Sequence, residues 1–343
     1  MSKYAEQYSR LTESLMEFFQ EKKQNENIVI SPLSIMTLLA IAADASTGKS
    51  KDEIISLIGE EVMKVEQNSS LKSSNAVCVK ESIRDTITEG YEKHLKETFD
   101  GKLFASEDIV RDVNAWVKEK TNGMIEEAAD DSMNNMAACL LNAIAFEAEW
   151  MEEYTEDDIY EEEFHNADGS VTTVQMMYST EDSYIEDESF TGFIKPYKDE
   201  KYAFMALLPK KNSTCKKIDF TRLFQSASEE TVHVRMPEFR YDFKEDLTET
   251  CKKLGIQTIF TPAADFSPLT SAPLQMEAVI HKAHIEVDSH GTKASAMTMA
   301  VVAMAGIPAF DFKKVRLDRP FAYAIMDTGT GLPVFTGIYN QAE

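Results

Sequence analysis

The stretch that decides the fold is Ala137-Ala-Cys-Leu-Leu-Asn-Ala-Ile-Ala-Phe-Glu-Ala-Glu-Trp150. It is a long, nearly uncharged run in a chain of which 27% of the residues are charged. Such a run is typical of a central strand that is buried on both faces. Helical patterns dominate before it and strand patterns after it, and no internal repeat or Gly/Ser/Pro-rich linker divides the chain. We therefore predict one α+β domain over residues 1–343, with helices mostly first and sheets second.

Helical patterns fill the chain before this strand. Apolar residues recur at helical spacing over residues 4–18, which predicts an amphipathic helix. Ser31 and Pro32 open a second helix, because serine caps a helix N-terminus and proline fits its first turn. That helix runs to about residue 45 and is apolar almost all round, so we expect it to be buried and central. The pattern Ser50-Lys-Asp-Glu53 predicts a capping box for a third, short helix.

Strand patterns dominate after about residue 136. Alternating or short apolar runs predict strands over residues 171–178, 202–208, 231–240 and 279–287. Two further strand patterns flank Asp327-Thr-Gly-Thr-Gly331, and together they predict a hairpin.

Composition limits the possible partners. The net charge of −24 argues against binding to nucleic acid, because phosphates would not be neutralised. No segment approaches the roughly 20 consecutive apolar residues of a membrane helix, so we expect no membrane partner. The first residues do not form a signal peptide. We expect an extracellular protein whose leader is absent from this sequence, and an intracellular location is the alternative.

We predict no cofactor and no metal site. On a strand, residues three apart point to opposite faces, so His281 and His284 do not share a metal. A buried, hydrogen-bonded His281 is the better interpretation. The four cysteines are far apart in sequence, which favours free thiols over disulfides or metal ligands: Cys78, Cys139, Cys215 and Cys251.

The common enzyme motifs are missing from the sequence. There is no Gly-x-Ser-x-Gly, P-loop, Gly-x-Gly-x-x-Gly or His-Glu-x-x-His pattern. Asp327-Thr-Gly matches the triplet of aspartic proteases, but that chemistry needs two carboxylates that share a proton, and only one copy exists. A turn between two strands explains the triplet, so we predict that the protein is not an enzyme. A hydrolase that uses Asp327 is the rival hypothesis.

An uncharged segment follows the strand pattern at 279–287. Residues 291–305 read Gly-Thr-Lys-Ala-Ser-Ala-Met-Thr-Met-Ala-Val-Val-Ala-Met-Ala, with no charge after Lys293. In an extended chain, one face holds only small or β-branched residues: Thr292, Ala294, Ala296, Thr298, Ala300 and Val302. A strand with such a face can slide between other strands without clashing. Taken alone, the segment also fits an ordinary buried strand or an alanine-rich helix.

Several segments, taken together and in order, resemble the serpin family over nearly the whole chain. Asn27-Ile-Val-Ile-Ser-Pro-Leu-Ser-Ile35 is similar to the start of the family's helix B. Leu141-Asn-Ala-Ile-Ala-Phe-Glu-Ala-Glu-Trp150 is similar to the central strand of its main sheet. The match continues through Ala278-Val-Ile-His-Lys-Ala-His-Ile-Glu-Val287, Gly291-Thr292 and Arg319-Pro-Phe321.

The resemblance implies the α+β serpin fold, with three β-sheets, about eight or nine α-helices and an exposed reactive-centre loop over about residues 289–318. The chain is short for the family, and the polar stretch 60–71 implies that helix D is reduced or lost. Some relatives use that helix for activation by glycosaminoglycans, so we expect no heparin activation. We also expect a monomer.

The resemblance also implies a function. In serpins, a target protease attacks the loop as a substrate and forms an acyl-enzyme. The cleaved loop then inserts into the main sheet as an extra strand and carries the tethered protease with it. We therefore expect a suicide-substrate inhibitor that forms a covalent complex with a serine protease. A non-inhibitory serpin that acts as a binding protein or chaperone is the alternative.

Counting as in inhibitory members places the reactive bond between Ala305 and Gly306, and the alternative is the bond between Met304 and Ala305. Small apolar residues there suit an elastase- or subtilisin-like target. Cleavage after Met304 points to a chymotrypsin-like target, and a cysteine protease is a further alternative. The family's hinge corresponds to Gly291, Thr292, Lys293, Ala294, Ser295, Ala296, Met297 and Thr298.

Two further features carry over from the family, and a third position differs from it. Its shutter, a hydrogen-bond cluster between helix B and the central strands that controls sheet opening, corresponds to Ser31, Ser34, Asn142 and His281. Trp150 falls at the breach, where the loop first enters the sheet. Ser289 stands where the family usually has a glutamate, so we expect one clamp of the closed sheet to be missing.

Overall fold

The computed structural model describes residues 3–60, 68–211, 213–292 and 312–342. Contacts group the chain into two compact units, and each unit is assembled from three separate segments. Unit 1 contains Met1–Leu15, Ile30–Phe146 and Asp242–His284; unit 2 contains Met16–Val29, Glu147–Tyr241 and Ile285–Glu343. Neither unit is a continuous piece of chain, and the single domain stays a prediction.

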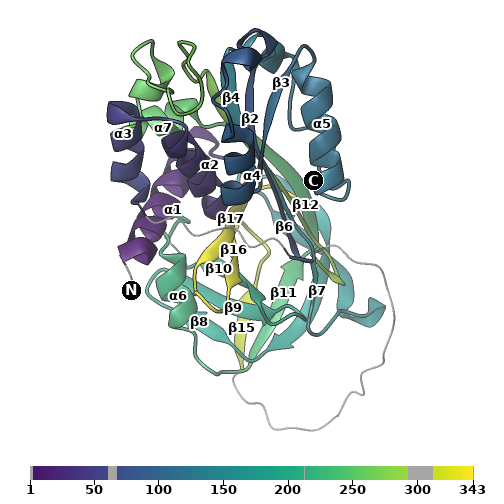
Figure 1. Cartoon of the computed structure of the whole chain (residues 1–343). Helices are drawn as coiled ribbons and strands as arrows, with labels where there is room; N and C mark the ends of the chain where they lie inside the picture. Colours follow the sequence, from purple (N-terminus) through teal and green to yellow (C-terminus); the bar gives the residue numbers. More distant parts are fainter. Residues whose placement is uncertain (1–2, 61–67, 212, 293–311, 343) are drawn as a thin grey trace. The chain divides into compact units, whose positions relative to one another are not determined.

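The α+β class is confirmed (Figure 1). Within the described residues there are seven α-helices and four short 3₁₀-helices. The same residues form sheets of six, five and four strands and one two-stranded ladder. The three larger sheets agree with the expectation from the serpin resemblance. No helix is described between α3 (Gly48–Ile58) and β2 (Leu71–Lys80), where residues 61–67 lie outside the described part.

The five-stranded sheet has the order β12-β13-β4-β2-β3. Its strands are β12 (Phe239–Asp246), β13 (Ala278–Val287), β4 (Ala138–Phe146), β2 and β3 (Gly101–Ser106). All nine residues of β4 are buried, as its uncharged sequence predicts. The predicted strand over 137–150 is wrong in its length, because the regular strand ends at Phe146. Ala148 and Glu149 instead form β5 (Ala148–Glu149), which pairs with β14 (Gly291–Thr292) in unit 2.

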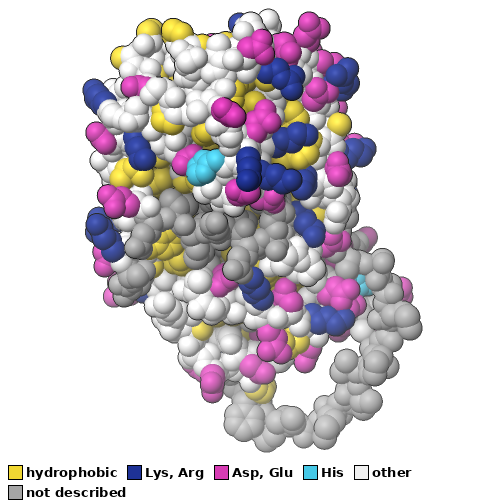
Figure 2. Space-filling model, viewed as in Figure 1, with side chains coloured by type: hydrophobic (Ala, Val, Ile, Leu, Met, Phe, Trp, Pro, Cys, Tyr) yellow, Lys and Arg dark blue, Asp and Glu magenta, His cyan; other side chains and the backbone are white. Residues whose placement is uncertain are grey.

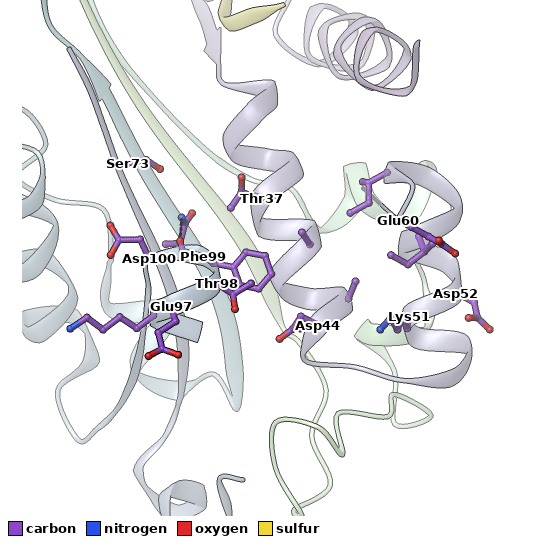
Figure 3. A pocket seen from close by; sticks show the side chains of 16 residues that line it. Thr37, Asp44, Lys51, Asp52, Glu60, Ser73, Glu97, Thr98, Phe99 and Asp100 are labelled. Carbon is purple, nitrogen blue, oxygen red and sulfur yellow. Dashed lines mark hydrogen bonds between the residues drawn. The ribbon is translucent and has the colours of Figure 1, made fainter. Parts of the chain in front are cut away.

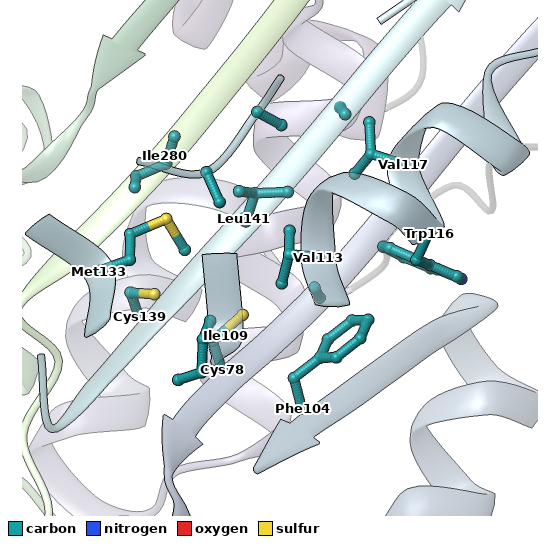
Figure 4. Packing of buried hydrophobic residues seen from close by; sticks show 14 of the residues in the cluster. Cys78, Phe104, Ile109, Val113, Trp116, Val117, Met133, Cys139, Leu141 and Ile280 are labelled. Atoms are coloured by element: carbon teal, nitrogen blue, oxygen red, sulfur yellow. The ribbon is translucent and has the colours of Figure 1, made fainter. Parts of the chain in front are cut away.

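Helix α5 (Ile109–Lys120) covers one face of the five-stranded sheet. Figure 4 shows Val113 and Val117 of this helix directed toward the strands. Cys78 and Cys139 lie directly opposite each other in the β2–β4 ladder and point to this same apolar cluster. All four cysteines are free thiols, as predicted. Because side chains alternate along a strand, the neighbouring residues of β2 and β4 face the other side of the sheet.

Helix α2 (Pro32–Asp44) is the buried helix that the sequence predicts. Every residue from Pro32 to Ala43 is buried. The Ser31 hydroxyl caps the helix by accepting a hydrogen bond from the Ser34 N–H at 3.2 Å. The first described helix of the chain, α1 (Lys3–Lys22), is also confirmed, and α4 (Tyr91–Phe99) lies close to α2 and β3.

The predicted capping box at Ser50 and Glu53 is wrong. Helix α3 begins at Gly48, so Ser50 lies inside it and is buried. The Ser50 hydroxyl accepts a hydrogen bond from the Asp265 N–H at 3.1 Å. The Glu53 carboxylate accepts bonds from the N–H groups of Gln257 and Thr258 at the start of the 3₁₀-helix η4 (Thr258–Phe260). Partners about 200 residues away therefore replace the local cap.

Unit 2 contains the six-stranded and four-stranded sheets. The six-stranded order is β1 (Ile28–Ile30), β17 (Pro333–Tyr339), β16 (Phe321–Asp327), β10 (Tyr202–Pro209), β9 (Phe190–Pro196) and β8 (Tyr184–Glu186). The four-stranded order is β15 (Lys313–Arg316), β11 (Val232–Pro237), β7 (Val171–Glu181) and β6 (Ile159–His165). The predicted hairpin is confirmed, because β16 and β17 pair antiparallel.

The predicted strand over 231–240 is two strands. β11 ends at Pro237 and β12 begins at Phe239, with Glu238 between them. Proline has no N–H to donate to a ladder, which favours the end of a strand at this point. The two strands belong to different sheets, and Glu238 is the single residue that connects them.

Charged side chains of both signs are interspersed on the face that Figure 2 shows. Acidic residues are in excess over the whole chain, which has a net charge of −24. Across the ranges that the structure describes, no helix combines the length and the apolar character needed to cross a membrane.

Candidate functional site

The most informative site in unit 1 is the ladder between β4 and β13, which we call the seam. Residues 278–284 of β13 pair in parallel with residues 139–145 of β4. His281 lies directly opposite Asn142, and the distance from its Nδ1 to the Asn142 Oδ1 is 3.2 Å. The two central strands are thus direct neighbours, with no strand between them, and a polar pair joins them across the seam.

His281 also ties the seam to helix α2. The Ser31 N–H donates a hydrogen bond to the Nε2 of His281 at 3.1 Å. Because Nε2 accepts, Nδ1 carries the proton and donates a hydrogen bond to the Asn142 Oδ1. A neutral imidazole has one donor and one acceptor, and both are used here. His281 is fully buried, and this burial lowers its pKa to about 3.

Asn142 extends the cluster to β2. Its Nδ2 donates to the Ser73 Oγ at 3.2 Å and to the Asn75 Oδ1 at 3.0 Å. The structure therefore brings Ser31, Asn142 and His281 of the predicted shutter into one buried network. Ser34 joins this network only through its backbone N–H, which donates to the Ser31 hydroxyl. The Ser34 hydroxyl is buried without a hydrogen-bond partner in the described structure. Sequence reasoning missed Ser73 and Asn75, whose signal is the run of three uncharged polar residues Ser73-Ser-Asn75 directly before an apolar strand pattern.

Trp150, the predicted breach residue, is fully buried in unit 2. Its indole N–H donates to the Asp288 carbonyl at 2.9 Å, and its ring stacks on Tyr197 with centroids 4.6 Å apart. The ammonium of Lys195 lies 5.5 Å from the centre of the Trp150 ring. Lys195 and Glu181 form a buried ion pair at 2.9 Å, with 4% and 8% of their side chains exposed. Sequence reasoning missed this pair, because two charged residues in strands carry no local sign of burial.

Only the first two residues of the predicted hinge lie in the described structure. Gly291 and Thr292 form β14 and pair antiparallel with Glu149 and Ala148. The Thr292 hydroxyl is 2.9 Å from the hydroxyl of Tyr197, and Thr292 is fully buried. A Cβ at position 291 would collide with the Ala148 carbonyl oxygen, so this close approach requires glycine.

The turn before the hinge is held by contacts that the sequence did not reveal. The Asp288 carboxylate accepts bonds from the N–H groups of His290 and Gly291 at 2.9 and 3.1 Å. The Ser289 N–H donates to the Glu238 carboxylate at 3.2 Å. Burial, together with the nearby Asp288 carboxylate, raises the pKa of Glu238 above its ordinary value. The backbone of Ser289 is therefore bound to a carboxylate, that of Glu238, although position 289 itself is not a glutamate.

His290 adds a further contact to this turn. Its Nδ1 lies 3.3 Å from a carboxylate oxygen of Glu153, and its carbonyl accepts a bond from the Trp150 N–H at 2.9 Å. The turn is therefore anchored through both its backbone and its side chains.

The remaining predicted residues divide into two groups. Lys293, Ala294, Ser295, Ala296, Met297 and Thr298 of the hinge, and Met304, Ala305 and Gly306 at the reactive bond, lie outside the described residues. His284 is described, and its Nδ1 binds the Asp242 carboxylate at 2.7 Å, away from the partners of His281.

The rival site at Asp327 has a structural role. The Asp327 carboxylate accepts bonds from the N–H and the hydroxyl of Thr330 at 2.8 and 2.9 Å, as a turn between two strands requires. Among the described residues, no group of three or more His, Cys, Asp or Glu side chains could hold a metal ion.

Comparison with known proteins gives the family. A family model described as serpin (serine protease inhibitor) matches residues 6–342. The chain therefore belongs to the serpin family. A serine protease inhibitor of Cyanea capillata is 29% identical, over 92% of this chain and 93% of its own length.

Solved structures give the same result. The native state of tengpin, a thermophilic serpin, is 30% identical and matches with a TM-score of 0.90, over 100% of this chain and 95% of that one. Thyroxine-binding globulin in complex with thyroxine is 20% identical and has a TM-score of 0.84, over 98% of this chain and 99% of that one. The fold alone therefore does not decide what a serpin does.

Proposed function

We propose that this serpin is a suicide-substrate inhibitor that traps a serine protease by inserting its cleaved loop into the seam. The observation that carries the proposal is the pairing of Gly291 and Thr292 with Glu149 and Ala148. These partners follow β4 directly in the chain, and the ladder is antiparallel. A segment that continues from Thr292 in the same direction would pair with β4 on one edge and with β13 on the other.

The seam is closed by the backbone ladder of residues 278–284 with 139–145 and by the side-chain bond between His281 and Asn142. The His281–Asn142 bond must break before a strand can enter between β4 and β13. Insertion would break the β4–β13 ladder and form two new ladders in its place, so the net gain is about one ladder, with each bond worth roughly 0.5–1.5 kcal/mol. Ordering costs about 1–2 kcal/mol per residue, so insertion is favourable only if the closed sheet is metastable before cleavage.

The target is proposed from the loop sequence. Cleavage between Ala305 and Gly306 suits a protease with a shallow, apolar primary pocket, such as an elastase or a subtilisin-like enzyme. The fifteen residues from Gly291 to Ala305 would span about 50 Å as a strand. Displacement of the acylated protease over such a distance distorts its active site, and loss of one oxyanion-hole donor alone slows deacylation by roughly 10²–10³.

The test is incubation with elastase, followed by denaturing electrophoresis and mass spectrometry. We expect a complex that survives SDS and a released peptide that begins at Gly306. Ala296→Arg is the matched control, because Ala296 lies on the small-residue face of the loop that would enter the sheet, and a buried strand does not accept a charged side chain. This variant should be cleaved at the same bond without forming the complex. If elastase cleaves the unaltered protein without forming the SDS-stable complex and keeps its activity, the proposal is wrong.

The non-inhibitory alternative makes a different prediction. A binding protein or chaperone need not insert its loop, so cleavage would leave the unfolding temperature nearly unchanged. Our proposal predicts a sharp rise in that temperature after cleavage, because insertion adds a fully paired strand to the sheet. Thermal unfolding before and after limited elastase digestion separates the two functions.

A further inference from the structure

Unit 1 contains a cavity that the inhibitory mechanism does not use. It has a volume of about 690 Å³ and lies between α2, α3, α4 and β2 (Figure 3). Cavities of roughly 300–1,000 Å³ are the size that holds small molecules in proteins. The cavity is therefore large enough for an organic ligand rather than a single water or ion.

The walls of the cavity combine an apolar interior with a charged rim. The apolar side chains are Ala40, Ala43, Ile55, Ile58 and Phe99. Figure 3 shows the Phe99 ring directed from the end of α4 toward α2. Phe99 is only partly buried. An aromatic face is thus available to an apolar ligand.

The charge at the rim determines which ligand fits. Five carboxylates line the cavity: Asp44, Asp52, Glu60, Glu97 and Asp100. Among the described lining residues, two carry ammonium groups, Lys51 and Lys96; in addition, Lys93 pairs with Glu97 at 3.8 Å and His94 with Asp44 at 3.0 Å. An anionic ligand would meet a net negative rim on a chain whose charge is −24. The rim therefore favours a small molecule with an apolar body and an amine.

A chain of hydrogen bonds connects the cavity to the seam. Asn75 lines the cavity, and its Nδ2 donates to the Phe99 carbonyl at 3.2 Å. The Asn75 Oδ1 accepts from Asn142 at 3.0 Å, and Asn142 binds His281 across the seam. Ser73, a second cavity residue, also accepts from Asn142. A ligand in the cavity would touch the two side chains that position Asn142.

Two walls of the cavity are attached to the strands of the seam. Its β2 wall is joined to β4 by the antiparallel ladder. Its α2 wall begins next to Ser31, whose N–H binds His281 on β13. Helix α2 also contacts β4, so it touches both strands of the seam and must change its position relative to at least one of them when β4 and β13 separate. The shape of the cavity therefore changes when the seam opens.

We propose that this cavity binds a small amphipathic amine and that the bound amine holds the seam closed. A ligand shifts an equilibrium only by its difference in affinity for the two states. An amine that fits the closed shape loses contacts when α2 shifts relative to β2, so it slows opening. The regulatory half of this proposal rests on the proposed inhibitory function, whereas the binding half does not.

The binding half is tested by calorimetry on the intact protein with three matched probes. These are 4-phenylbutylamine, 4-phenylbutanol and 4-phenylbutyrate, which share one skeleton and differ only in charge. We expect the amine to bind at least about tenfold more tightly than the acid, with the alcohol between them. Equal affinities for the three probes, or no binding of the amine, would overturn the proposed site.

Variants at the rim locate the bound amine. Asp52→Asn together with Glu97→Gln removes one charge from α3 and one from α4, and should weaken amine binding by roughly fivefold. Glu92→Gln together with Glu119→Gln is the matched control, because both residues are exposed on helices and neither lines the cavity. If the control pair weakens binding as much as the rim pair, the amine is bound elsewhere and the proposal is wrong.

The regulatory half is tested through the rate of inhibition of elastase. Saturating amine should slow formation of the SDS-stable complex by about fivefold or more, at the lower end of typical allosteric couplings. The rim variant should need a higher amine concentration for the same effect. Tight amine binding with an unchanged rate would refute the coupling to the seam. If no complex forms even without the amine, the proposed function fails, while calorimetry still decides the binding half.

Discussion

Replacing His281 should change how the stability of the protein depends on pH. His281 is fully buried and neutral, and burial lowers its pKa to about 3. An unfolded histidine has a pKa of about 6.5. Between these two values the unfolded chain binds a proton that the folded chain does not. The stability due to neutral His281 is therefore complete above pH 6.5 and is lost as the pH falls toward 3.

The size of this effect follows from the two pKa values. Each pH unit in that window costs about 1.4 kcal/mol of unfolding free energy. Integrated from pH 7.5 to pH 4.5, the loss is about 2.7 kcal/mol. In His281→Gln this term is absent, but the glutamine cannot satisfy both Ser31 and Asn142. At pH 7.5 the variant should thus be less stable by about 1–3 kcal/mol, and the two proteins should become similar near pH 4.5.

The assay is urea unfolding followed by the fluorescence of Trp116 and Trp150 at a series of pH values. His94→Gln is the control, because His94 is an exposed histidine on α4. It should retain the steep pH dependence of the unaltered protein. If the unaltered protein and His281→Gln lose stability in parallel between pH 7.5 and 4.5, burial does not keep His281 neutral and the reasoning is refuted.

Three further predictions concern other contacts. Lys195→Met leaves the Glu181 charge buried and unpaired, and should cost about 3–5 kcal/mol in urea unfolding. Adding Glu181→Leu should recover most of that loss, and a neutral single variant would show that the pair is not desolvated. Gly291→Ala places a Cβ against the Ala148 carbonyl and should cost about 1–3 kcal/mol; an unchanged unfolding temperature would contradict this. Glu53→Ala leaves the N–H and hydroxyl groups of the buried Thr258 without their acceptor and should cost about 1–3 kcal/mol, whereas no loss in urea unfolding would mean that water replaces the carboxylate.

Sequence patterns predict elements well where one local signal decides the structure. Helix α2 is apolar on all sides and opens with Ser31-Pro32, and the structure buries it and caps it at Ser31. The hairpin around Asp327 follows from turn residues between two strand patterns. The opposite orientations of His281 and His284 follow from the two-residue period of a strand. In each case the information lies within a few neighbouring residues.

Predictions fail where distant partners override a local pattern. Ser50 and Glu53 have the spacing of a capping box, but their hydrogen bonds go to residues about 200 positions away. The strand over 137–150 ends early because Ala148 and Glu149 pair with the hinge. The contacts of Ser289 with Glu238, and of Lys195 with Glu181, depend on how the sheets are built. Such pairs follow from topology and leave no periodic trace in the sequence.

The register of the seam has a consequence for synthesis of the chain. Strand β4 is buried along its whole length, yet its partner β13 begins about 140 residues later. At roughly 5–20 residues per second, a ribosome needs about 7–28 seconds to add that stretch. During this interval one edge of a strand that is apolar except for Asn142 has no native neighbour, which favours aggregation. The nascent chain is therefore expected to need a chaperone on β4 until β13 emerges, and slower translation between the two strands should lower the soluble yield.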